Sequence, residues 1–470
     1  MSILILSPDV ITERMAGPAI RYWEFAKALA PLSKITLAAP NLIPESLQQA
    51  TQARLIQHSP ENIADLASLH DIIIFQGHLL DCYPVLRQSE KILIADLYDP
   101  VPLESLEQHS GDMQIIAEQV RMMNTQIKRA DYFLCASERQ RDLWLGHLLA
   151  LGRINPLTIN QIQQRVITVP FGVPDTAPQR DGAGLRQTLD NGAGLVLLWG
   201  GGIWEWFDPL TLIRAIHRLL PRYPDLRLVF LGTQHPNPAI DSMPMQHRAQ
   251  ALAHDLGLYG RQVIFQSGWV PYDCLHNYLL DADVGVSAHL DTLETHFSFR
   301  TRLLYYLWAG KPIITTQGDV LADEIARMKA GIVVNPGDVE AWIAAIDKLH
   351  NPDYYAGYVE GVKALAQEYR WSIVTQALLA CCSNASRSPD MILENGLRKS
   401  VVWDCEHEYT VVSEQLETCK HEYNVVSEQL ETCKHEYNAV SEQLDIMAHS
   451  ISMRVTAPLR TLRRWLMSIG

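Results

Sequence analysis

The stretch "LVLLWGGGIWEWFDPLTLIRAI", residues 195–216, contains the local unit on which the fold prediction rests. Its apolar start is typical of a strand covered on both faces, and Asp208-Pro209 is a typical helix start. The glycines at 200–202 between them allow a ligand to approach the backbone closely. They do not form a dinucleotide-binding G-x-G-x-x-G, because Trp204 stands where a glycine would let the helix pack. The stretch therefore predicts a strand, a ligand-binding loop and a helix.

The same alternation of apolar strands and amphipathic segments extends in both directions. It is interrupted at 174–194, a stretch rich in Pro, Gly and Asp that we interpret as a domain boundary. This pattern predicts an α/β fold of two doubly wound, Rossmann-like domains, residues 1–180 and 191–382, with a cleft between them. The expected strands are 3–7, 34–40, 71–77, 91–99, 131–137 and 166–172 in the first domain and 195–201, 226–232, 262–268, 284–288, 311–316 and 331–336 in the second. Helical segments are expected at 18–30, 103–129, 138–151, 338–350 and 353–382.

Composition excludes several classes of protein. The 470 residues are 47% hydrophobic and 20% charged, which is typical of globular domains, and no apolar run reaches the 18 residues of a membrane-spanning helix. The net charge of −14 argues against nucleic-acid binding. The first residues, "MSILILSPDV", are expected to form a strand and not a signal peptide. Eight cysteines without a C-x-x-C pair are expected to be reduced thiols of a cytoplasmic protein.

The C-terminal region is a different kind of sequence. Residues 383–400 are expected to be a linker, and residues 401–448 contain a repeat of 14 residues, "CKHEYNVVSEQLET". Its apolar positions alternate at spacings of 3 and 4, which predicts a coiled coil about 70 Å long over 402–447. A lone helix would leave this seam in water, so a homo-oligomer is expected. The seam residues are Tyr409, Val412, Leu416, Cys419, Tyr423, Val426, Leu430, Cys433, Tyr437, Val440, Leu444 and Met447.

The last segment, residues 449–470, has four arginines and no acid, whereas residues 401–448 have a net charge of −9. Leu459, Leu462, Leu466 and Ile469 share one helical face, with arginines and Trp465 nearby. This amphipathic pattern over 454–470 favours an anionic membrane surface. Packing on a partner protein and a disordered tail are the alternatives.

Two arginines have an unexpected position in "HFSFRTRLLYYLWAGKPIITT", residues 296–316. The sequence predicts a helix that is capped by Ser298, ends at Gly310 and is followed by a strand. Arg300 and Arg302 would then lie at the positive end of the helix dipole, which prefers acids. Together with the free N–H groups of the first turn, they favour a phosphate or diphosphate ligand. Alternatively they are surface arginines whose stems cover apolar residues.

Several runs resemble GT-B glycosyltransferases of family 4. The runs "WAGKPIIT" and "GDVLADEI" resemble the donor-binding region of that family. The runs "ERMAGPAIRYWEFAKALA", "DLYDPVPLE" and "ETHFSFRTRLLYYLWAGKP" resemble a bacterial branch that takes part in surface polysaccharide assembly. The resemblance covers about residues 1–380.

The resemblance implies a retaining glycosyltransferase, and the basic segment at 454–470 would hold it at the inner face of the cytoplasmic membrane. It would move a sugar from a nucleotide-diphosphate sugar to a lipid-linked or surface glycan, with no metal cofactor. The family holds its donor with two glutamates eight positions apart, where this chain has Glu294 or Phe297 and then Tyr305. The residues expected to bind the donor are Gly201, Gly202, Glu294, Arg300, Arg302 and Tyr305, and those expected to act in catalysis are Asp96, Asp99 and Arg300.

Other interpretations stay open at this point. Tyr305 in place of an acid is compatible with a degenerate fold that serves as a non-catalytic scaffold. A nucleotide-sugar epimerase and a sugar phosphorylase share the GT-B fold. Asp281 and Asp283 in "LDADVG" look like a metal-binding D-x-D, but their place between a helix and a strand is more typical of capping. Trp204, Trp206 and Phe207 form either an aromatic ligand platform or part of the core.

Overall fold

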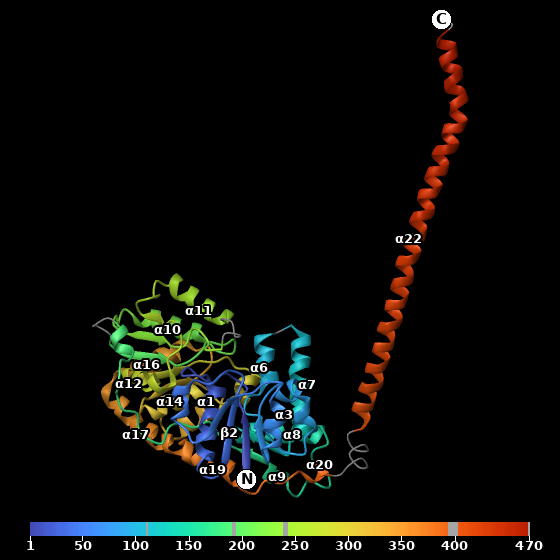
Figure 1. Cartoon of the computed structure of the whole chain (residues 1–470). Helices are drawn as coiled ribbons and strands as arrows, with labels where there is room; N and C mark the ends of the chain where they lie inside the picture. The colour runs from blue at the N-terminus through green and yellow to red at the C-terminus, as the bar shows by residue number, and fades with distance from the viewer. Residues whose placement is uncertain (110, 190–193, 238–242, 393–402, 469–470) are drawn as a thin grey trace. The chain divides into compact units, whose positions relative to one another are not determined.

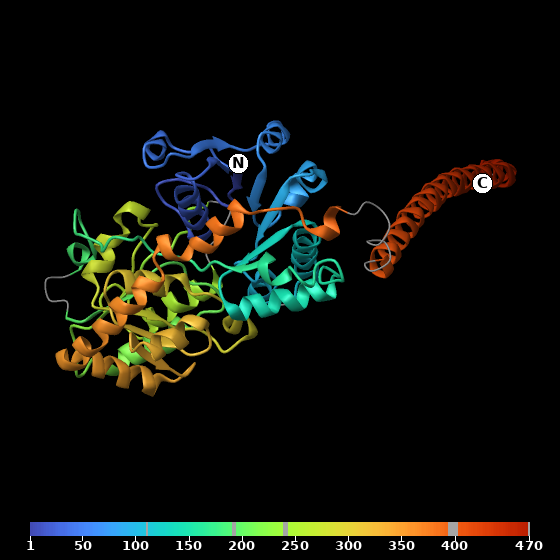
Figure 2. The same cartoon turned by 90° about the horizontal axis from the view of Figure 1, so that it is seen from below.

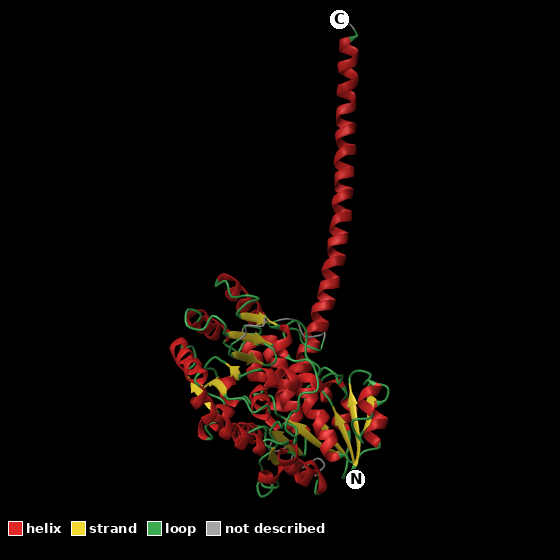
Figure 3. Ribbon diagram, turned by 90° about the vertical axis from the view of Figure 1, so that its left-hand side faces the viewer, coloured by secondary structure: helices red, strands yellow, loops and turns green. Residues whose placement is uncertain are grey.

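The fold contains two parallel β-sheets, each covered by helices (Figures 1 and 3). The computed structural model describes residues 1–109, 111–189, 194–237, 243–392 and 403–468. Two units are distinguished, residues 1–394 and 395–470, and each is described by itself. The two Rossmann-like domains predicted from the alternation both lie in the first unit and are confirmed.

The sheet of the first domain has the order β3-β2-β1-β4-β5-β6-β7, and all its pairs are parallel. The order reverses between β1 and β4, and such a switch point opens a crevice at the carboxyl ends of the strands. The strands are β1 Ser2–Leu6, β2 Lys34–Ala39, β3 Arg54–Gln57, β4 Ile72–Phe75, β5 Ile92–Asp96, β6 Tyr132–Cys135 and β7 Val166–Thr168.

The sheet of the second domain repeats this plan with the order β10-β9-β8-β11-β12-β13, and its pairs are also parallel. Its switch point lies between β8 and β11, directly before the glycine loop at 200–202. The strands are β8 Val196–Trp199, β9 Arg227–Phe230, β10 Val263–Phe265, β11 Val284–Ser287, β12 Ile313–Thr316 and β13 Gly331–Val334.

Helices connect the strands and cover both sheets (Figure 1). Those of the first domain are α1 Gly17–Leu29, α2 Glu45–Gln48, α3 Ile63–Ser68, α4 Leu79–Cys82, α5 Pro84–Gln88, α6 Val101–Gln108, α7 Met113–Arg129, α8 Glu138–Ala150 and α9 Ile162–Arg165. Those that follow are η1 Leu185–Thr188, α10 Pro209–Leu219, α11 Pro244–Asp255, η2 Tyr272–Cys274, α12 Leu275–Asp281, α13 Leu293–Phe297, α14 Thr301–Trp308, α15 Val320–Arg327, α16 Val339–His350, α17 Pro352–Glu368, α18 Trp371–Val374, α19 Gln376–Ser383 and α20 Pro389–Ile392.

Two local predictions differ from the structure. The segment 103–129 is not one helix but two, α6 and α7, because Asp112 caps α7 by accepting hydrogen bonds from the backbone N–H groups of Gln114 and Ile115. The expected helix over 298–310 is also divided. Ser298 does not cap it: α13 ends at Phe297, and α14 begins at Thr301 with Arg300 at its N-cap.

The end of the first unit returns to the first domain. After α17, the chain pairs again with the first domain through hydrogen bonds between the backbones of Val173 and Tyr369 (2.8 Å) and of Trp371 and Val173 (2.9 Å). Helix α18 then contacts α1, and α19 contacts β7. Figure 2 shows this orange segment lying across the first domain. Residues 371–382, which were expected in the second domain, therefore pack on the first domain.

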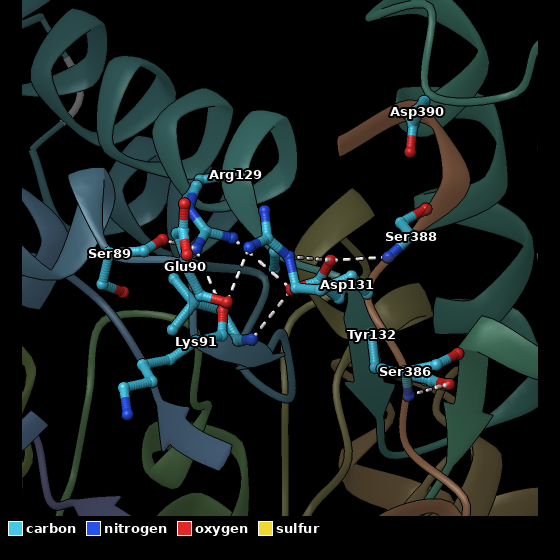
Figure 4. Close-up of polar contacts among 12 residues, drawn as sticks. Ser89, Glu90, Lys91, Arg129, Asp131, Tyr132, Ser386, Ser388 and Asp390 are labelled. Atoms are coloured by element: carbon cyan, nitrogen blue, oxygen red, sulfur yellow. Dashed lines mark hydrogen bonds and ion pairs between the residues drawn. The ribbon is translucent and has the colours of Figure 1, made fainter. Parts of the chain in front are cut away.

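The expected linker over 383–400 is fixed on the first domain along its first part (Figure 4). The buried carboxylate of Asp131 accepts hydrogen bonds from the backbone N–H of Ser388 (2.7 Å) and from Nε of Arg387 (3.2 Å). Asp390 forms an ion pair with Arg153 at 2.7 Å, and both side chains are buried. Residues 393–402, the rest of the linker and the start of the expected coiled coil, lie outside the described residues.

The second unit contains one long helix, α22, Trp403–Met467. It continues through Pro458, so the expected coiled-coil segment and the expected basic tail form one helix. The seam residues from Tyr423 to Met447 are exposed in the single chain, for example Tyr423 at 73% and Leu444 at 61%. Ile469 of the expected tail lies outside the described residues.

Helix α14 packs against β11 because Gly285 has no side chain. A Cβ atom at Gly285 would lie 2.1 Å from Cγ of Tyr306. The Tyr306 ring therefore lies directly on the strand, and its hydroxyl donates to the carbonyl oxygen of Val286 (3.2 Å). The same hydroxyl accepts a hydrogen bond from the backbone N–H of Gly200 (2.7 Å). The helix, the strand and the glycine loop are thus held together through one side chain.

We expect Gly285→Ala to lower the free energy of unfolding by about 1–3 kcal/mol, because the added methyl group overpacks a filled space. Thermal and urea denaturation measure the effect. Gly146→Ala in α8 is the matched control, since no atom lies within 4 Å of its Cβ position. The control is expected to raise stability by about 0.5–1 kcal/mol. An unchanged midpoint for Gly285→Ala would contradict the packing described.

Candidate functional site

A cavity of about 510 Å³ lies between the two domains, at the carboxyl ends of both sheets. From the first domain it is lined by the loops that follow β1, β4 and β5 and by parts of α6 and α7. From the second domain it is lined by the loops after β8 and β9 and by the start of α14. Two switch points thus meet at one cavity, which is where doubly wound domains bind ligands.

The second-domain wall contains the glycine loop that follows β8. Gly201 has a φ of +99°, a conformation that side chains rarely adopt. Gly200, Gly201 and Gly202 all line the cavity, so the backbone itself forms this part of the wall. The loop keeps its position through the Tyr306 hydroxyl, a contact that the sequence did not indicate.

Arg302 lines the cavity beside this loop, and no described carboxylate pairs with it. Its Nη2 donates to the carbonyl oxygen of Gly202 (2.7 Å), and its guanidinium group lies over the rings of Phe207 (4.1 Å) and Trp199 (4.7 Å). The Nη1 atom is buried and has no hydrogen-bond partner among the described residues. Burial lowers the pKa of Arg302 to about 9, and the neighbouring charge of Arg300 adds to this effect. This arrangement favours an anion as the missing partner.

Arg300 differs from Arg302 because its charge is already paired. Its Nη1 and Nη2 atoms donate to the two carboxylate oxygens of Glu294 at 2.9 and 2.5 Å, and both residues are buried. Arg300 lines the cavity, whereas Glu294 does not. The guanidinium group of Arg300 is therefore not available as the free cation that had been expected. Glu294, which was expected to bind the donor, does not line the cavity and binds Arg300 instead. Bidentate pairing of this kind positions Arg300 firmly beside Arg302.

Tyr305 lies on the cavity wall, as expected, one residue before the supporting Tyr306. Its hydroxyl oxygen is buried without a hydrogen-bond partner among the described residues. Burial raises its pKa far above the usual range, so it remains a neutral hydroxyl that is able to donate to or accept from a ligand.

Asp96 does not reach the cavity. Its carboxylate accepts two hydrogen bonds from Arg21, at 2.7 Å from Nε and 3.0 Å from Nη2, and both side chains are fully buried. The guanidinium group of Arg21 also lies over the rings of Phe25 and Tyr98. This buried pair occupies both oxygens of Asp96, so we assign Asp96 no contact with a substrate.

Asp99 lines the cavity, as expected for the end of β5. One carboxylate oxygen accepts a hydrogen bond from Nε2 of Gln76 (2.8 Å). Burial raises the pKa of Asp99 to about 7, and the nearby charge of Asp96 adds to the increase. At neutral pH this carboxyl group is therefore divided between its two protonation states, which suits an exchange of protons with a ligand.

Glu104 on α6 is a cavity residue that sequence reasoning missed. Burial raises its pKa well above the usual range, with the charges of Asp99 and Glu294 adding to the effect and Arg300 opposing it. Acidic residues are common in the first turn of any helix, so the position of Glu104 in the first turn of α6 did not indicate a site. Only the fold brings it beside Asp99.

Gln140 links the two walls of the cavity. This fully buried side chain donates from Nε2 to the carbonyl oxygens of Tyr98 (2.8 Å) and Phe297 (2.9 Å). Tyr98 precedes Asp99, and Phe297 ends α13 just before Arg300. One amide group therefore fixes the acidic wall relative to the basic wall.

The remaining candidates are structural. Trp204, Trp206 and Phe207 all line the cavity. Trp206 and Phe207 are also buried in the core of the second domain, whereas Trp204 is half-buried and stacks on Trp206 at 5.5 Å. Asp281 and Asp283 do not line the cavity. They accept hydrogen bonds from the backbone N–H groups of Arg186 (2.9 Å) and Val196 (2.7 Å), respectively.

Comparisons with known proteins agree with this geometry. Residues 194–351 match the family model described as Glycosyl transferases group 1. The D-inositol 3-phosphate glycosyltransferase of Acidothermus cellulolyticus is 26% identical over 224 residues, which are 47% of this chain and 48% of that protein. The chain thus matches about half the length of this curated relative.

Solved structures share the two-domain fold. Sucrose-phosphate synthase from Thermosynechococcus elongatus superposes with a TM-score of 0.59 at 17% identity, over 81% of this chain and 98% of that one. Anabaena HepE in complex with UDP and glucose superposes with a TM-score of 0.60 at 14% identity, over 81% and 99%. Residues 194–351 are therefore similar to the group 1 glycosyltransferases, and they lie in the second half of a GT-B fold.

Proposed function

We propose that the chain is a retaining glycosyltransferase that moves a sugar from a nucleoside diphosphate donor to a glycan hydroxyl. The unneutralised guanidinium group of Arg302, beside the glycine loop, is the observation that carries this proposal. It lies within residues 194–351, the part that matches the group 1 family. The complex of HepE with UDP and glucose supports a nucleotide-sugar ligand for a fold of this kind.

The reaction needs stabilisation of negative charge at one place in the cavity. When the bond between the anomeric carbon and the diphosphate breaks, the leaving group gains charge. Arg302 and the backbone of Gly201 and Gly202 would bind this diphosphate, with Arg300 held beside them by Glu294. The hydroxyl of Tyr305 would contact the donor as a neutral hydrogen-bonding group in place of a carboxylate.

The acceptor would enter from the first-domain wall. For the configuration to be retained, its hydroxyl oxygen forms the bond to the anomeric carbon on the same face from which the diphosphate leaves. Asp99 is placed to take the proton of that hydroxyl, because it lines the cavity and its pKa of about 7 leaves part of it ionised at neutral pH. We expect the rate to rise with pH through this pKa, since only the ionised form accepts a proton.

The proposed setting is the inner face of the cytoplasmic membrane, with a lipid-linked or surface glycan as acceptor. Among the described residues, no helix is long and apolar enough to cross a membrane. The end of α22 instead exposes Leu462, Trp465 and Leu466 together with its arginines. Such a helix lies on an anionic surface with its apolar face buried.

The exposed seam of α22 supports self-association. Val426, Leu430, Val440 and Leu444 are each more than half exposed in the single chain, and with Cys433 and Tyr437 between them they form a stripe with spacings of 3 and 4. A second copy of the same helix offers the identical stripe, which is the arrangement of a coiled coil. Several basic tips on one oligomer would strengthen membrane binding by avidity.

The donor site is tested by thermal stabilisation with UDP, GDP and dTDP. We expect one of them to raise the melting temperature of the wild type, and Arg302→Ala to weaken its affinity by about 10- to 100-fold, because a charge-assisted contact is lost. Arg261→Ala, an exposed arginine outside the cavity, is the control. No stabilisation by any nucleotide, together with no donor hydrolysis, would contradict the proposal and favour a scaffold. Arg300→Ala is a poorer test, because it leaves Glu294 buried and unpaired.

The oligomer is tested by light scattering after size exclusion. We expect the wild type to have a mass that is a multiple of the 53.0 kDa chain. The double variant Leu430→Asp/Leu444→Asp should shift it to the monomer, because buried charges on the seam are costly. Asn424→Asp/Asn438→Asp adds the same charge off the seam and should leave the mass unchanged. A monomeric wild type would rule out self-association.

Membrane binding is tested by co-sedimentation with vesicles of phosphatidylglycerol and phosphatidylcholine. We expect binding to the mixed vesicles and not to pure phosphatidylcholine. Arg463→Gln/Arg464→Gln should weaken it by about 30-fold or more, at about 1 kcal/mol for each arginine. Arg218→Gln/Arg222→Gln, two exposed arginines in the last turn of α10 and just after it, is the control. Equal binding of the two double variants would contradict a role for the tip of α22.

A further inference from the structure

The polar groups of the interdomain cavity are divided by charge between its two walls. Both arginines that line it, Arg300 and Arg302, belong to the second domain. The first domain contributes no lysine or arginine to the lining among the residues the structure describes. Its polar lining side chains are Asp9, Gln76, His78, Tyr98, Asp99, Glu104, Gln108 and Gln119.

Several groups on the first-domain wall accept hydrogen bonds and lack a donor. Gln76 is 6% exposed, and while its Nε2 binds Asp99, its Oε1 is buried with no partner among the described residues. Oε1 of Gln119 is likewise buried with no hydrogen-bond partner among the described residues. The carboxyl groups of Asp99 and Glu104 lie beside them. A buried acceptor without a donor is costly, so this wall is suited to a ligand that supplies hydroxyl hydrogens.

The same wall is unsuited to a phosphate. A phosphate group offers acceptor oxygens to a surface that already consists of acceptors, and its negative charge would lie next to two carboxyl groups. Phosphate sites in proteins use guanidinium groups, ammonium groups or helix N-termini. The guanidinium groups of the lining lie on the opposite wall, and the first-domain wall offers helix starts, such as that of α1 at Gly17 and Pro18, with Asp99 and Glu104 on the same wall. Like charges placed together in an interface disfavour binding.

We propose that the first-domain wall is a subsite for an uncharged sugar residue, whose hydroxyl groups donate to Gln76, Asp99 and Glu104, and that it rejects phosphorylated acceptors. This inference rests on the proposed glycosyltransferase activity and narrows its acceptor. The sugar hydroxyl attacks the anomeric carbon, the bond from that carbon to the diphosphate oxygen breaks, the hydroxyl proton passes to the Asp99 carboxylate, and the nucleoside diphosphate leaves. Glu104 is a positioning residue that binds a neighbouring hydroxyl.

The test uses the full chain and the nucleotide sugar whose hydrolysis it catalyses. Release of nucleoside diphosphate is measured in water alone, then with glucose, galactose or mannose at high concentration, then with the 6-phosphate of each. We expect neutral sugars to accelerate release at least about tenfold more than their phosphates. Equal or greater acceleration by the phosphates would overturn the inference. So would hydrolysis that no neutral sugar accelerates. Absence of both nucleotide binding and hydrolysis would instead overturn the glycosyltransferase proposal itself.

Variants of the first-domain wall test whether its side chains cause the preference for neutral acceptors. Glu104→Gln keeps the size of the side chain and replaces the ionisable carboxyl group with an amide that can donate a hydrogen bond to a phosphate, so we expect the ratio of neutral to phosphorylated acceptor rates to fall by about threefold or more. Gln76→Leu should raise the KM for the neutral sugar, while stabilisation by the nucleotide stays at the wild-type value. Glu107→Gln on the same helix, outside the cavity lining, is the control. A ratio in Glu104→Gln equal to that of the wild type would contradict the role of Glu104.

Discussion

The guanidinium group of Arg302 lies between two aromatic rings and a carbonyl oxygen, and no described carboxylate neutralises it. An unpaired, half-buried cation destabilises the empty protein, and a bound anion removes this cost by pairing with the cation. The arrangement requires the glycine loop and α14 to keep their places, which Tyr306 secures by bonding to both Gly200 and Val286. The cavity therefore has cationic side chains on its second-domain wall and carboxyl groups on its first-domain wall.

Most of the fold was predictable because the signals are local. Apolar runs bounded by glycine, proline and aspartate gave every strand of the second sheet. The edge strand β3, Arg54–Gln57, was missed because only its middle residues are buried and its sequence is short and mixed. The division between α6 and α7 depended on a cap at Asp112 inside a continuous amphipathic pattern. The packing of α18 to α20 on the first domain could not be predicted from the local sequence, because it depends on contacts between segments that are far apart in the chain.

The candidate site was less predictable because charge pairing depends on the fold. Arg302 and Asp99 were identified from their place at the ends of a helix and a strand, and both line the cavity. Arg300 and Asp96 were identified by the same argument, yet Glu294 and Arg21 bind them. Arg21 is 75 residues away from Asp96 in the chain, so no spacing rule indicates the pair. Gln76 and Glu104 join the site only when β4, β5 and α6 come together.

The two passages of the chain between the domains run side by side, where Val173 pairs with Tyr369 and Trp371. Gly172 leaves room for the Trp371 ring there, since a Cβ atom would lie 2.6 Å from that ring. Residues 386–390 are held on the first domain by a hydrogen bond from Ser388 to Asp131 and an ion pair between Asp390 and Arg153. The chain up to Asp390 is therefore part of the first domain, although it follows the whole of the second domain in sequence.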